Sequence, residues 1–138
     1  MRYLKHFNES YVTTNELKEF CEWNLATLLD NGYKFQVEYD GWDDDNDNFY
    51  IDIDSNKFGT FFSWDDVKDY VIPFMFVLKE KYDLDWGGYD IKLVLGIINN
   101  ARQTHEIELY SRFFKLEDLE DLKADKINSL VIKVSDKR

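Results

Sequence analysis

The residues best suited to chemistry in this 138-residue sequence are the acidic side chains of residues 43–54. Asp43, Asp45 and Asp47 occupy positions one, three and five of a calcium-loop pattern, and Asp54 stands at position twelve. Calcium binds several hard oxygen ligands at about 2.3–2.6 Å, and alternate acids on a tight loop can provide them. The pattern therefore predicts one metal site, formed by these four aspartates, with calcium as the cofactor.

Three features of the same segment favour an alternative without metal. Asn48 replaces the glycine of position six, Asp54 is shorter than the usual glutamate, and both flanks have the alternation of β-strands instead of helices. The alternative is a solvated hairpin loop, whose like charges resist edge-to-edge pairing between sheets. In that case the chain needs no cofactor.

Trp42 stands directly before this acidic loop and predicts a contact with another protein. Tryptophan is over-represented among the residues that dominate binding energy, and an aromatic ring among carboxylates suits a basic protein surface. The expected partner-binding residues are Trp42, Asp43, Asp44, Asp45 and Asp47. The alternative is that Trp42, like Trp64 and Trp86, lies at the end of an element with its ring buried and its N–H in water.

Other combinations of residues give little support for a catalytic site. Asp52 and Asp54 share the outward face of a predicted strand, about 7 Å apart, and exposure there predicts an ordinary pKa for Asp52. His6, His105 and Cys21 are too few for a zinc site of the usual ligand set. The sequence contains no nucleophile elbow, phosphate loop or dinucleotide fingerprint. We therefore expect no catalytic residues, and an enzyme is the minority interpretation.

The net charge of −11 is concentrated in two segments. Residues 40–69 contain ten acidic residues and two lysines, and residues 115–125 contain five and two, whereas the remainder is balanced. This charge repels nucleic-acid phosphates, so we expect no direct contact with DNA or RNA. It favours a protein partner with a basic surface. In a variant of this interpretation, the carboxylates imitate phosphates and inhibit a DNA-binding protein.

Membrane insertion and secretion are not expected. No run approaches the roughly 18–20 apolar residues of a membrane-spanning helix, and the N-terminus lacks the apolar core of a secretory signal. The single cysteine, Cys21, cannot form an intramolecular disulfide, and its place among apolar residues indicates a buried side chain. These features predict a soluble cytoplasmic protein, and they do not specify an oligomeric state.

Residues 1–10 resemble the leader of many small uncharacterised proteins of tailed bacteriophages. The resemblance lies in Met1-Arg2-Tyr3-Leu4-Lys5, followed by Phe7-Asn8-Glu9-Ser10. It implies an accessory protein of the infected host cytoplasm that contacts a virion component or a host factor and is packaged in the phage head. Phe7-Asn8-Glu9 is similar to the hydrophobic-x-Glu sites that prohead proteases cut, which implies processing between Glu9 and Ser10. The alternative is an N-terminal arm that packs Tyr3, Leu4 and Phe7 on the domain.

Two predicted helices form the framework behind these candidate residues. Residues 13–31 have the apolar stripe of a helix, begun by a capping box of Thr13 with Glu16 and ended by Asn31-Gly32. Residues 61–82 contain the most apolar helix, and Pro73 should kink it or divide it in two.

The remaining pattern is that of a sheet. Alternating apolar residues predict strands at 33–39, 49–53, 89–98, 105–110 and 130–134, an extension at 58–62 and a short acidic helix at 116–122. The order is α-β-β-α-β-β-(α)-β. It predicts an α+β fold, with a largely antiparallel sheet and two main helices packed on one face. We expect a leader or N-terminal arm at residues 1–10 and a single domain at residues 11–138.

Overall fold

The computed structural model of the protein describes residues 14–43, 46–57, 60–81, 89–98, 102–110 and 115–136. These residues form four helices and a five-stranded sheet in which every neighbouring pair of strands is antiparallel. The predicted α+β class with an antiparallel sheet is therefore confirmed. The elements are α2 (Thr14–Asn24), α3 (Ala26–Asp30), β1 (Tyr33–Asp43), β2 (Asn46–Ser55), α4 (Trp64–Lys81), β3 (Tyr89–Ile98), β4 (Thr104–Tyr110), α5 (Leu116–Glu120) and β5 (Ile127–Asp136).

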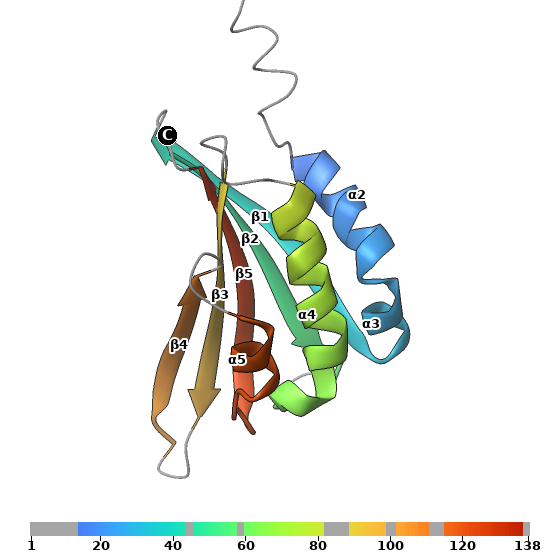
Figure 1. Ribbon diagram of the computed structural model, residues 1–138, viewed down its shortest axis with the longest axis vertical. Helices are drawn as coiled ribbons and strands as arrows, with labels where there is room; N and C mark the ends of the chain where they lie inside the picture. The colour runs from blue at the N-terminus through green and yellow to red at the C-terminus, as the bar shows by residue number, and fades with distance from the viewer. Residues whose placement is uncertain are drawn as a thin grey trace, which may run out of the picture.

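The strand order in the sheet is β1-β2-β5-β3-β4 (Figure 1). β1 and β2 form one antiparallel pair, and β3 and β4 form another. β5 lies between the two pairs and is hydrogen-bonded to β2 on one side and to β3 on the other. The strand that comes last along the described chain therefore joins the two hairpins into one sheet.

Alternation along the strands gives the sheet one buried face. Ile51 on β2, Ile132 on β5 and Leu93 on β3 are neighbours in the register and are completely buried. Leu17 of α2 and Phe74 of α4 belong to the same core. Because the helices lie on this side of the sheet (Figure 1), no helix of the described residues covers the opposite face.

α4 is one continuous helix with Pro73 inside it, so a division into two helices at this residue is wrong. Proline lacks an N–H and leaves the carbonyl of Asp69 without its intrahelical donor. Both residues are exposed, so water can hydrogen-bond to that carbonyl, while Val71 and Phe74 keep the helix packed on the core. No described helix, α4 included, is long and apolar enough to span a membrane.

The helix predicted at residues 13–31 is interrupted at Leu25, where the φ and ψ angles are −110° and 16°. The side-chain amide of Asn24 donates to the carbonyl oxygen of Phe20 at 2.9 Å, at the end of α2. The N–H of Leu25 still donates to the carbonyl of Cys21 at 2.8 Å, so the chain keeps its course into α3. Gly32, with φ of 92°, ends this region in the left-handed conformation that the sequence predicts.

Trp64 connects the start of α4 to the segment that contains α5. Its indole N–H donates to the carbonyl of Leu119 at 2.6 Å, and its backbone N–H donates to the carbonyl of Ala124 at 2.7 Å. Trp64 is completely buried. The expectation that its indole N–H stays in water is therefore wrong, because the last turn of α5 provides an acceptor inside the protein.

Candidate functional site

The uncovered face of the sheet carries unevenly distributed charges. On β1 and β2 the register places Glu38, Asp40, Asp52 and Asp54 on this face, and Lys34 is the only cation that the described residues of these two strands contribute to it. The half formed by these five residues is referred to below as the acidic face. Among the side chains described on the other half the charges balance, with Lys92, Lys133, Glu106 and Glu108.

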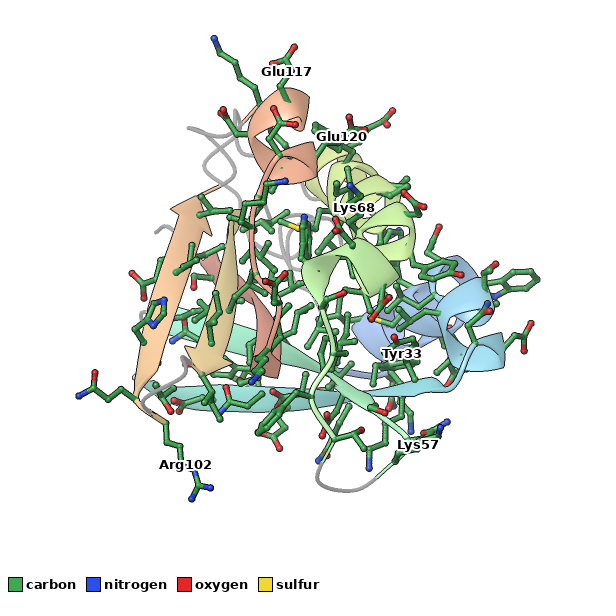
Figure 2. The ribbon with its side chains drawn as sticks, turned by 90° about the horizontal axis from the view of Figure 1, so that it is seen from below. Tyr33, Lys57, Lys68, Arg102, Glu117 and Glu120 are labelled. Atoms are coloured by element: carbon green, nitrogen blue, oxygen red, sulfur yellow. The ribbon has the colours of Figure 1, made fainter. Side chains whose placement is uncertain are left out.

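The second acidic segment of the sequence lies elsewhere. Glu117 and Glu120 belong to α5, which Figure 2 shows at the opposite end of the molecule from β1 and β2. Lys68 of α4 donates to the carbonyl of Glu120 at 3.4 Å and forms an ion pair with Asp65 at 3.2 Å. The acidic residues of β1 and β2 are therefore separate from those of α5, which lie instead beside the acidic start of α4.

Asp52 is the half-buried carboxylate of the acidic face. It lies opposite Gln36 on β1 and opposite Val131 on β5, so neighbours on both sides reduce its contact with water. Burial, followed by repulsion from Glu38 and Asp54, raises the pKa of Asp52 above its ordinary value. The expectation of an ordinary pKa for Asp52 is wrong, because β5 covers Asp52 on its second side.

A hollow of about 310 Å³ lies beside Asp52, where β2 and β5 separate. The pairing of these strands ends at Ile53 with Leu130, and β5 is next paired with Phe62 by an isolated bridge from Ile127. This bridge is all that the described residues show of the extension predicted at 58–62. The polar residues that line the hollow are Lys34 and Gln36 from β1, Asp52 and Asp54 from β2, and Asn128 and Ser129 from β5.

A β-bulge in β5 determines the position of Asn128 at this hollow. The register with β3 shifts between the pairs Gly96–Ser129 and Ile97–Ile127, which leaves Asn128 as the extra residue. A Cβ atom on Gly96 would lie 2.8 Å from Oδ1 of Asn128 and 3.2 Å from Cβ of Ser129. Glycine therefore allows the Asn128 side chain to lie close against β3.

Of the predicted partner-binding residues, Trp42 and Asp43 end β1 and Asp47 is the second residue of β2, at the tip of the β1–β2 hairpin. Asp43 pairs with Asn46, which agrees with the hairpin-loop alternative to a calcium loop. Trp42, Asp43 and Asp47 lie in strands at positions whose side chains are not among those described, and Asp44 and Asp45 lie outside the described residues. Their expected contact with a partner stays a prediction.

Asp54 is too far from this tip to share a metal ion with it. Asp47 is the second residue of β2 and Asp54 the last but one, so roughly 23 Å of extended strand separate them. The predicted site of Asp43, Asp45, Asp47 and Asp54 around one ion is therefore wrong in including Asp54, whose Oδ1 instead accepts the N–H of Ser55 at 2.8 Å. Within the described part of the chain, no group of three or more His, Cys, Asp and Glu residues could hold a metal.

The remaining candidates have simple placements. Cys21 is completely buried in the core, and burial, together with Glu22, raises the pKa of its thiol to about 12. His105 is exposed on the edge strand β4. His6 and the expected processing site, Glu9 and Ser10, lie outside the described residues.

Trp23, which is not among the predicted site residues, is the most exposed of the large apolar side chains described, at 85%. It lies on α2, one turn after Glu19, on the side away from Leu17 and Cys21. The available signal was a large aromatic residue on the polar side of an amphipathic helix.

Comparisons of the chain with family models, with curated proteins and with solved structures found no match.

Proposed function

We propose that this protein binds a basic protein partner through the acidic face and catalyses no reaction. The observation that carries the proposal is the presence of Glu38, Asp40, Asp52 and Asp54 on the β1–β2 half of a sheet face that no described helix covers, where Lys34 is the only cation among the described residues of these two strands. Several carboxylates on a single face attract a basic surface and increase its association rate. Because the strand register holds their backbone positions, little order has to be gained on binding.

In this proposal the hairpin tip extends the acidic face. Asp43, Asp44, Asp45 and Asp47 add negative charge at the end of β1 and β2, and Trp42 provides an aromatic anchor. The partner is then a protein whose basic surface extends along the hairpin, with an apolar depression for the indole ring.

The resemblance of residues 1–10 to phage leaders supports a setting for this partner. We propose that the protein acts in a host cell infected by a tailed bacteriophage, where it binds a virion component or a host factor and is packaged in the head. Mass spectrometry of purified virions tests this setting. A chain that begins at Ser10 in the virion would support packaging and processing after Glu9, and absence of the chain from virions would refute packaging.

The binding proposal is tested with a variant of the full chain that carries Glu38→Gln, Asp52→Asn and Asp54→Asn. The tagged wild-type protein, expressed in its native cells, should capture a basic protein at a fixed ratio. An exposed ion pair contributes up to about 1 kcal/mol, so loss of three should weaken capture roughly tenfold or more. Raising the salt concentration should weaken the wild-type complex, because exposed charges are screened.

A matched control removes the same number of carboxylates from the helical side of the molecule. The control substitutions are Glu19→Gln, Glu22→Gln and Asp30→Asn, all at exposed positions. Equal loss of capture in both variants would show that only net charge matters and would refute a specific acidic face. Capture of no partner by the wild-type protein, or full capture by the acidic-face variant, would also refute it.

Duplex DNA serves as a competitor in the same experiment. If DNA displaces this protein from its captured partner, the acidic face acts as a phosphate mimic on a DNA-binding protein, which is the variant form of the proposal. If DNA has no effect, the partner uses a basic surface that does not bind nucleic acid.

A further inference from the structure

We infer that the hollow between β2 and β5 receives the guanidinium group of an arginine side chain from the basic partner. This inference rests on the proposed function and makes it more specific. The hollow opens beside the acidic face, so a partner that docks on that face brings its own side chains to the opening.

The size of the hollow suits one side chain. Sites for small molecules and cofactors usually have volumes of roughly 300–1,000 Å³, and about 310 Å³ is at the lower limit of that range. Three strands contribute to the walls, with Gln36 on β1, Asp52 on β2 and Ser129 on β5. Because β1 and β2 are paired throughout this region, their part of the wall is held by backbone hydrogen bonds.

The lining of the hollow is rich in hydrogen-bond acceptors. Asp52 and Asp54 offer carboxylate oxygens, and Gln36 and Asn128 offer amide oxygens. A guanidinium group has five N–H donors in one plane and binds a carboxylate through two parallel hydrogen bonds. Lysine has a compact, strongly hydrated charge without this fork, so arginine is the better fit to several acceptors spread around one hollow.

Asp52 has an electrostatic reason to bind a cation. Within the described part of the chain, no cation forms an ion pair with it. Its charge is opposed by partial burial and by the nearby carboxylates of Glu38 and Asp54, which together raise its pKa. Lys34 also lines the hollow, but it is exposed and lies opposite Asp54, two residues along β2 from Asp52. A guanidinium group in the hollow would compensate the charge of Asp52, which Lys34 does not neutralise.

The test is a titration of the ¹⁵N-labelled full chain with N-acetyl-argininamide, followed by NMR at neutral pH. N-acetyl-citrullinamide, which has nearly the same shape without the charge, is the matched control probe. The arginine probe should shift the amide signals of Asp52, Asp54, Asn128 and Ser129 and the side-chain amide of Gln36. We expect saturation in the millimolar range and much smaller shifts with the citrulline probe.

Two variants make the titration specific. Asp52→Asn should weaken binding of the arginine probe at least fivefold, whereas Glu106→Gln, on β4 of the same sheet face, should not change it. The inference is overturned if the probe shifts none of these signals, if citrulline acts equally, or if Asp52→Asn binds as well as wild type. Such a result would not refute the proposed function. The capture experiment measures binding of a whole protein partner, and it gives a negative result only if the acidic face does not bind that partner.

Discussion

The β-bulge at Asn128 leads to a quantitative prediction for Gly96→Ala. The added Cβ would lie 2.8 Å from Oδ1 of Asn128, closer than such atoms approach, so the Asn128 side chain must move. Ser129 Cβ, at 3.2 Å, must also yield by a few tenths of an ångström. The substitution therefore disturbs the two residues by which β5 lines the hollow with polar groups.

The expected change combines two opposing effects. Replacing glycine inside a strand by alanine stabilises the fold by roughly 0.5–1 kcal/mol, because glycine loses more conformational freedom on folding. Overpacking at a close contact destabilises it by typically 1–3 kcal/mol. Because the contact at Gly96 is tight, we expect a net loss of about 1 kcal/mol in the free energy of unfolding. In an Asn128→Ala background the closest contact is absent, and the same substitution should be nearly neutral.

The assay is urea denaturation of the wild type, the two single variants and the double variant, combined in a double-mutant cycle. The prediction is a coupling free energy of about 1 kcal/mol between Gly96 and Asn128. Additivity within about 0.3–0.5 kcal/mol, which is usual for independent sites, would refute the packing argument. A gain in stability from Gly96→Ala alone would refute it as well.

Three further outcomes follow from the described contacts. Folding raises the pKa of Asp52, so its ionised form destabilises the fold at neutral pH. Because solvent screens a half-exposed carboxylate, Asp52→Asn should raise the free energy of unfolding at pH 7 by at most about 0.5 kcal/mol. That gain should disappear as the pH falls through the raised pKa towards the ordinary value of 3.8, as urea denaturation at several pH values would show. Trp64→Phe removes the donor to the buried carbonyl of Leu119, so urea denaturation should show a loss of about 2–4 kcal/mol. The Cys21 thiol, with a pKa of about 12, should be inert to a thiol reagent at pH 8 in the native protein and react once urea unfolds it.

Local periodicity predicted much of the fold, because each of these helices and strands buries one face and its apolar residues therefore recur at a regular spacing. Val67, Val71, Phe74 and Leu78 recur at helical spacing, and all are buried on α4. The alternation at residues 89–98 likewise matches β3. The position of β5 between β2 and β3 was not predictable in this way, because pairing between distant strands leaves no periodic signal in either of them.

The candidate site was predictable only in part. The outward placement of Asp52 and Asp54 follows from strand alternation and is observed. The raised pKa of Asp52 depends on Glu38 and on Val131, which only the register brings to it. The hollow depends on a bulge, and nothing local in the sequence shows that Asn128 is the unpaired residue or that Gly96 lies against it.

The central position of β5 means that the sheet cannot form as one piece until the last described strand has been made. On the ribosome, the hairpins β1–β2 and β3–β4 are made before Ile127 emerges, and until then Ile51 and Leu93 lack the side chain that lies between them. An unfinished or C-terminally cleaved chain would thus carry the acidic carboxylates without one wall of the hollow.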